Sequence, residues 1–373
     1  MKRFFILLLL FAAFTAVFVR FAPIAFVRLL PESLSGPIFS KIRPEIMPTI
    51  SIKKTPPAPS VLKYARPLWE KDTTQHRILI PVASLTANDA GRHKINRRRL
   101  NYLTAGRSFI AIADLSTFDI VILAPDLKVR RKWPMASGLA KMMQAPVAMA
   151  AYRDEIAALD RDGTLVWWDL RGNRKGSFKI DGFVYDLDIL NDGNFLVHQA
   201  KPYPYLLAIY SRSGHKKRQF GALPSSDAAS APLLHQGFAA RDRANRVALG
   251  LINPYKLFFF SAGGNPTHFI EITPEFQVFE PYAEKLGRNK WRVLRQRVVY
   301  DLTWHGEHLY VLVASDPERA ADWMEVFSRE GEFLQRFYLS MHAIRLDFWQ
   351  DDLILLGYDP RLKLERFRIE RIK

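Results

Sequence analysis

The clearest hydrophobic pattern in this chain is a set of short apolar runs separated by turns. Between residues 184 and 221, three apolar runs are followed by a more polar one. Asn191-Asp192-Gly193 lies between the first two runs, and Asp-Gly supplies the positive φ angles of a tight hairpin. The pattern predicts a four-stranded antiparallel unit with its polar strand facing water. The four runs are 184–189, 195–198, 206–210 and 216–220.

This unit recurs along the chain, as it does in repeat architectures. Val184-Tyr185-Asp186-Leu187 returns as Val299-Tyr300-Asp301-Leu302, and each copy precedes a glycine-centred turn. A second marker is an aromatic residue followed by a polar turn, and 123–126 is a version of it without glycine. The spacings between the marker glycines are 42, 49 and 68, near the ~40–50 residues of a propeller blade. The marker glycines are Gly172, Gly214, Gly263 and Gly331, and the longest spacing contains an insertion at about 273–296.

The repeats predict how the chain closes on itself. The last unit lacks one strand, while an orphan apolar run at 78–82 precedes the first unit. We expect these two to pair, because an open ring would leave two unpaired sheet edges. The predicted fold class is therefore all-β, a six-bladed β-propeller over 76–373, with an N-terminal strand closing the last blade. The six units are 100–133, 146–180, 184–221, 237–272, 298–339 and 344–372.

The beginning of the chain predicts a membrane anchor. Lys2 and Arg3 precede an uninterrupted apolar run of 16 residues, 4–19, so a hydrophobic N-terminal helix is expected within 1–27. A spanning helix needs ~20 apolar residues, which requires Arg20 to snorkel. No clear small-x-small cleavage site is present, so we favour an uncleaved anchor over a cleaved signal. The expected protein is a single-pass inner-membrane protein, with residues 4–27 in the membrane and a periplasmic propeller. The alternative is a secreted or periplasmic protein, and proline-rich 28–75 is the expected linker.

The candidate chemistry is sparse. The chain has no cysteine, which excludes disulfides, thiolate metal sites and cysteine nucleophiles. Gly-x-Ser-x-Gly, the P-loop and Gly-x-Gly-x-x-Gly are absent from the sequence. His305 and His308 flank Gly306 in a predicted hairpin, which indicates exposed turn histidines and no zinc site. Whether the protein is an enzyme stays open.

The recurring units resemble the six-bladed β-propellers of the NHL and lactonase-like type, over roughly 76–373. In such propellers the innermost strands line a central channel, and Asp186, Asp301 and Asp347 fall on strands expected there. An analogous acidic and amide set holds a divalent cation in lactonase-like propellers. The family's ligands are not matched residue by residue here, but three carboxylates converging on one axis would suit Ca²⁺, which takes six to eight oxygen ligands, so the three aspartates are candidate ligands. The alternative is that each aspartate faces water or caps a turn and that no cofactor binds.

Charge is the strongest global signal. Lys and Arg number 54 against 37 Asp and Glu, a net charge of +17. Such a surface favours an anionic partner, namely acidic lipid or an anionic polysaccharide, and a protein partner stays open. Nucleic acid is not expected outside the cytoplasm. The candidate anion-binding residues are Arg97, Arg98, Arg99, Arg288, Lys290 and Arg292.

The insertion at 273–296 mixes aromatic and basic residues. This mixture suits carbohydrate or lipid headgroups. We expect instead a short helix over 281–286 that packs its aromatic side chains over the propeller rim.

Two functions follow from these observations. The favoured one is a membrane-anchored, extracytoplasmic propeller that serves as a non-catalytic ligand- or protein-binding scaffold. The anchor, the basic surface and the lack of a catalytic motif favour it. The alternative is a lactonase-like, metal-dependent hydrolase with its site at the mouth of the central channel.

Overall fold

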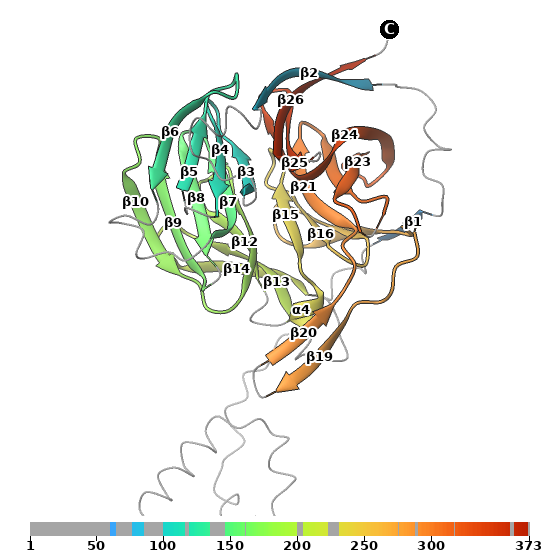
Figure 1. The fold of residues 1–373 in the computed structure, drawn as a ribbon. Helices are drawn as coiled ribbons and strands as arrows, with labels where there is room; N and C mark the ends of the chain where they lie inside the picture. Colours follow the sequence, from blue (N-terminus) through green and yellow to red (C-terminus); the bar gives the residue numbers. More distant parts are fainter. Residues whose placement is uncertain are drawn as a thin grey trace, which may run out of the picture. The chain divides into compact units, whose positions relative to one another are not determined.

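The protein is built almost wholly of β-strands (Figure 1). Within the described residues the one helix is α4 (Ala231–Leu234). The computed structural model describes residues 60–64, 77–85, 100–115, 119–134, 146–160, 162–199, 204–222, 231–274, 276–287, 290–316, 318–358 and 362–371. The expected N-terminal helix within 1–27 lies outside these residues. In the part that is described, no helix has the length and apolar character to cross a membrane.

Four sheets each contain four consecutive antiparallel strands, the unit that the sequence predicts. The first consists of β3 (Leu100–Ala105), β4 (Ile110–Asp114), β5 (Asp119–Leu123) and β6 (Val129–Pro134). The second consists of β7 (Pro146–Tyr152), β8 (Glu155–Asp160), β9 (Thr164–Asp169) and β10 (Arg174–Lys179). The third consists of β11 (Val184–Ile189), β12 (Phe195–Gln199), β13 (Tyr205–Tyr210) and β14 (Lys216–Ala222). The fourth consists of β15 (Gly237–Arg241), β16 (Val247–Leu251), β17 (Lys256–Phe260) and β18 (Pro266–Ile272).

Position within a sheet explains the composition of its strands. The second strand of the third sheet, β12, is buried along its whole length, whereas 216–218 on the outer strand β14 is exposed. An inner strand has neighbouring sheets over both faces and is therefore buried along its length, and its polar His198 is hydrogen-bonded to the Leu206 carbonyl. The outer strand meets water, and its lysines and arginine keep that edge from pairing with other chains.

A fifth strand extends the fourth sheet. β1 (Ser60–Tyr64) pairs in parallel with β18, from Ser60 opposite His268 to Tyr64 opposite Ile272. This segment falls within the range expected to be a linker. It covers an edge that would otherwise present unpaired N–H and C=O groups.

The last large sheet has seven strands in the order β2-β26-β25-β24-β23-β22-β21. Its β24 is 17 residues long, and pairs with β23 through its first part and with β25 through its last part. Four blades thus form individual sheets in the structure, and the six separate blades that were predicted are not observed. The physical reason is that the C-terminal strands stay hydrogen-bonded to one another through β24. The strands are β21 (Val299–His305), β22 (His308–Val313), β23 (Ala321–Phe327), β24 (Phe333–Trp349), β25 (Asp352–Tyr358), β26 (Leu362–Arg371) and β2 (Arg77–Leu85).

The N-terminal strand completes this sheet. β2 pairs antiparallel with β26, from Arg77 opposite Arg371 to Leu85 opposite Leu364 (Figure 1). The predicted pairing of the orphan run 78–82 with the last unit is therefore confirmed. It joins a strand from the beginning of the chain to the C-terminal strand of the fold.

The insertion forms a hairpin. β19 (Tyr282–Gly287) pairs antiparallel with β20 (Lys290–Leu294) in a separate two-stranded sheet. The helix expected over 281–286 is therefore wrong, because pairing across the hairpin satisfies the backbone groups that a helix would satisfy within itself. Phe276 packs against the core, but Phe279 and Tyr282 are exposed, so the aromatic side chains do not all cover the rim.

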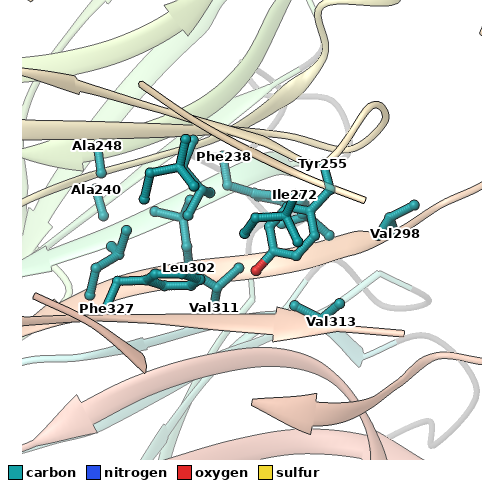
Figure 2. Close-up of a cluster of buried hydrophobic side chains, with 14 of the residues drawn as sticks. Phe238, Ala240, Ala248, Tyr255, Ile272, Val298, Leu302, Val311, Val313 and Phe327 are labelled. Carbon is teal, nitrogen blue, oxygen red and sulfur yellow. The ribbon is translucent and has the colours of Figure 1, made fainter. Parts of the chain in front are cut away.

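The innermost strands contact one another in cyclic order. Contacts run from β3 to β7, β11, β15, β21, β24 and back to β3. Apolar layers fill the space between neighbouring sheets, and Figure 2 shows the layer between the fourth sheet and β21–β23. Phe238 and Leu302 lie in this layer, with Tyr255 and Phe327 fully buried beside them. This ring of sheets around an axis is the arrangement of a β-propeller.

Candidate functional site

The innermost strands surround a cavity of about 360 Å³. Strands β3, β7, β11, β15, β21 and β24 all contribute to its wall. The structure places all three candidate aspartates, Asp186, Asp301 and Asp347, in this wall. The other charged residues of the wall are Asp188, Arg241, Asp242, Arg243 and Arg345.

The two aspartates of the recurring Val-Tyr-Asp-Leu sequence make the same contact. Asp186 Oδ2 accepts a hydrogen bond from the Ala239 N–H at 2.8 Å, and Asp301 Oδ2 accepts one from the Leu346 N–H at 2.9 Å. A bulge shifts the register of each strand just before the aspartate. Each donor lies on the next innermost strand around the ring. The carboxylates therefore join neighbouring strands that are not paired to each other in a ladder.

Two further aspartates repeat this contact. Asp347 Oδ2 accepts a hydrogen bond from the Ala105 N–H at 2.7 Å, and Asp188 Oδ2 accepts one from the Arg241 N–H at 2.9 Å. Asp188 was not singled out from the sequence. Its position two residues after Asp186 could have revealed it, because alternate residues of a strand share a face.

Burial changes the protonation of these carboxyls. It raises the pKa of Asp186 to about 8, with the nearby charge of Asp301 adding to the effect. Burial likewise raises the pKa of Asp347 to about 7 and that of Asp301 to about 6, although the Arg345 charge opposes the change at Asp301. The pKa of Asp188 is also raised by burial. A carboxyl that keeps its proton near neutral pH can donate a hydrogen bond, whereas an ionised one can only accept. The cavity wall therefore offers both donors and acceptors.

Arg345 places a fixed positive charge among these carboxyls. Its guanidinium lies 5.2 Å from the ring centre of Tyr102 and 5.1 Å from that of Phe238. Its Nη1 donates to the carbonyl oxygens of Tyr300 at 3.1 Å and Ile344 at 3.0 Å. These contacts hold the charge in one place, which is what a preformed polar site requires.

The aspartates do not assemble as metal ligands. Across the described ranges, no three His, Asp or Glu side chains are grouped so that they could hold a metal ion. Asp186, Asp301 and Asp347 share the cavity, but each uses one oxygen for a backbone N–H of the neighbouring strand. The geometry thus does not fit the expected Ca²⁺ site, and Ca²⁺ binding stays a prediction from the sequence.

Of the candidate anion-binding residues, the two that the structure describes do not line the cavity. Arg97, Arg98, Arg99 and Arg288 lie outside the described residues, and Lys290 lies on β20. Arg292, also on β20, donates through Nε to Glu284 Oε2 at 3.0 Å. Both partners are about half exposed, so this ion pair contributes little to stability.

The turn histidines sit where the sequence placed them. His305 ends β21 and His308 begins β22, on either side of Gly306. His305 lies at the cavity, stacked on Phe348 with 4.2 Å between ring centres. Its Nε2 is 3.3 Å from Asp351 Oδ1, and burial lowers its pKa. The ring is thus partly buried, which differs from the exposed turn that was expected.

No protein-family model and no curated protein sequence matches the chain. Among solved structures, it is similar to a member of the DUF4221 family from Bacteroides vulgatus, with a TM-score of 0.52 and 9% identity over 79% of this chain and 99% of that one. It is also similar to streptogramin B lyase (TM-score 0.49, 8% identity, 79% and 98% covered). A further similar structure is BamB from Moraxella catarrhalis (TM-score 0.46, 11% identity, 78% and 100% covered). The ring of sheets in this chain, together with its likeness to the DUF4221 structure, confirms the architectural resemblance to propellers predicted from the sequence. At such low identity the likeness concerns the fold alone.

Proposed function

We propose that this β-propeller is a non-catalytic binding module, tethered by residues 4–27 to the inner membrane with its propeller in the periplasm. The observation behind the proposal is the way in which the cavity aspartates are hydrogen-bonded. Asp186, Asp188, Asp301 and Asp347 each accept a backbone N–H from the neighbouring innermost strand. Carboxylates held in this way brace the wall of a preformed polar cavity, and such cavities bind ligands without needing to rearrange.

We also propose that the seven-stranded sheet serves as two blades that share β24. The cyclic contacts among β3, β7, β11, β15, β21 and β24 support this, because β21 and β24 each take an innermost position. Register shifts in the pairing of β24 with both neighbours support it as well, since they let one long strand leave one blade and enter the next. The ring would then hold six blades, closed by β2 on β26.

The chemistry of the wall suggests what it binds. Carboxyls with raised pKa values lie beside Arg345, so the wall presents donors and acceptors of both signs. Such a wall suits a polar group of a ligand, or a polar loop of a protein partner, that forms several hydrogen bonds at once. Arg243 is exposed at the cavity and is available for the first contact.

Cross-linking tests the binding proposal. A photoreactive residue replacing Arg243 in the full chain should capture the ligand or partner in intact cells. The matched control is the same residue replacing Lys217, an exposed basic residue on the outer strand β14. A specific product from position 243 and none from 217 supports the proposal. Identical patterns from both positions would contradict it.

A lactonase-like hydrolase is the second candidate. One observation favours it: Asp186, Asp301 and Asp347 line the same cavity and have raised pKa values. Metal analysis of the purified full chain, with a melting curve in the presence and absence of EDTA, separates the two functions. The binding module should melt at the same temperature with EDTA. Stoichiometric Ca²⁺ or Zn²⁺ and an EDTA-sensitive melting temperature would instead support the hydrolase, and Asp347→Asn should then abolish hydrolysis of a lactone panel.

A further inference from the structure

The β19–β20 hairpin has no role in the proposed binding cavity. It forms its own two-stranded sheet and projects from the blade sheets beside α4 (Figure 1). An isolated two-stranded hairpin is only marginally stable in water. A hairpin kept in this position needs a surface to pack on.

Large apolar side chains are concentrated here. Phe279 is 44% exposed, Tyr282 52% and Leu286 57%. Three of the nine exposed large apolar side chains among the described residues thus fall within eight consecutive positions, 279–286. Single exposed apolar residues need no explanation, but a concentration of them marks an interaction site.

The charge of the hairpin indicates what covers it. Its sequence, 282–294, holds four basic residues against the single acid Glu284, so its net charge is +3. Lys285 is exposed next to Leu286, on the face of β19 opposite Tyr282. Apolar side chains next to cations suit the boundary between anionic headgroups and acyl chains, where aromatic rings and basic residues both gather. A protein groove would have to match the same mixture with its own acids. The basic residues are Lys285, Arg288, Lys290 and Arg292.

We propose that the β19–β20 hairpin docks on an anionic lipid surface. The hairpin enters the headgroup region edge-on, so that Tyr282 on one face of β19 and Lys285 on the other both contact lipid, with Leu286 beside the turn. This inference rests on the proposed membrane tether but not on the binding cavity. A spanning tether keeps the protein at the membrane but does not by itself set the orientation of the propeller. The hairpin therefore supplies a second contact that fixes how the propeller is presented at the membrane.

The absence of cysteine makes the test direct, because one introduced cysteine carries the only label. The full chain with Leu286→Cys, bearing an environment-sensitive fluorophore, is reconstituted into vesicles of phosphatidylcholine alone or of an equal mixture with phosphatidylglycerol. Brominated lipids then report contact with the bilayer. The matched control is Tyr338→Cys, which places the label at a 69% exposed position on β24.

The expected result is quenching at position 286 that is several-fold stronger than at 338, appears only in the anionic vesicles and falls as salt rises. Lys285→Glu with Lys290→Glu should remove this quenching without changing the melting temperature. Equal quenching at both positions, or none at 286, would overturn the proposal, as would capture of a protein partner by the hairpin in place of lipid. The Arg243 cross-link should persist in the double variant, so a failure of the hairpin proposal is distinct from a failure of the cavity proposal.

Discussion

A glycine in the left-handed conformation ends the turn between the third and fourth strands of several units. The φ angles are 87° at Gly172, 81° at Gly214, 75° at Gly264 and 83° at Gly331. The sequence marker in the fourth unit was Gly263, but Gly264 donates the turn hydrogen bond to Ser261. In the first unit Leu127 occupies the same place with a φ of 64° and donates to Ala124. That unit keeps the turn without glycine.

Replacing one of these glycines should destabilise the fold. In Gly214→Ala the new Cβ would lie 2.9 Å from Phe178 Cβ, in a backbone conformation that side chains disfavour. We expect a loss of about 1–3 kcal/mol in urea unfolding. Gly306→Ala is the matched control, because its φ is 58° but no atom lies within 4 Å of the new Cβ. If both variants lost the same stability, the contact with Phe178 would have no role.

Asp186 makes stability depend on pH. Its pKa rises from an ordinary 3.8 to about 8 on folding, so the folded state holds the proton more tightly. Its contribution is therefore full below about pH 4 and is lost as pH rises through about 8. Asp186→Asn keeps an oxygen for the Ala239 N–H but cannot ionise. Its melting temperature should exceed that of the wild type by roughly 2 °C or more at about pH 9, and the advantage should vanish below about pH 4.

A control separates charge from hydrogen bonding at this position. Asp186→Ala removes both the charge and the acceptor for Ala239. It should melt below Asp186→Asn at every pH. A pH profile of Asp186→Asn that parallels the wild type would show that this carboxyl does not titrate on folding.

At the scale of elements, a buried polar network joins the fourth sheet to the seven-stranded sheet. The Tyr255 hydroxyl donates to Glu325 Oε2 at 2.7 Å, and Arg336 Nε donates to Glu325 Oε1 at 3.1 Å. The side chains of Glu325 and Arg336 are only 1% and 4% exposed. The Arg336 guanidinium also lies 3.9 Å from the ring centre of Trp323. Glu325 thus receives hydrogen bonds from side chains in two other parts of the chain.

Breaking this network should be costly. Glu325→Gln leaves the buried Arg336 charge without its counterion, so urea unfolding should show a loss of about 3–5 kcal/mol. Tyr255→Phe removes one hydrogen bond to a charged group and should cost less, about 1.5–3 kcal/mol. Glu307→Gln is the surface control, since Glu307 is 58% exposed in its ion pair with Arg329. A control that lost as much as Glu325→Gln would refute the role of burial.

At the scale of the whole molecule, the ring depends on a strand from the beginning of the chain. Deleting residues 1–90 removes β2 and leaves the edge of β26 unpaired, whereas deleting 1–70 removes only β1 among the described strands. We expect the longer deletion to lower the melting temperature by about 5–10 °C more than the shorter one. Equal melting temperatures would mean that closure by β2 does not stabilise the fold.

The sequence by itself determined the repeat. Apolar runs with Asp-Gly turns between them require antiparallel strands, and the recurrence of Val-Tyr-Asp-Leu placed Asp186 and Asp301 on equivalent innermost strands. The orphan run 78–82 could be assigned as the partner of the last strand, β26, because a sheet edge needs a partner. Asp347 was found through its position on the last innermost strand.

Only the tertiary structure decided what these residues do. The N–H groups that the aspartates bind belong to other innermost strands, such as Ala239 for Asp186, 53 residues away, and no local pattern encodes that proximity. The same limit explains the error at 281–286, where pairing with β20 formed a hairpin in place of the expected helix. It also explains why β24 joins strands that the sequence divided into separate units. Local patterns set which strands form, whereas contacts between sheets set their partners and the protonation of the side chains between them.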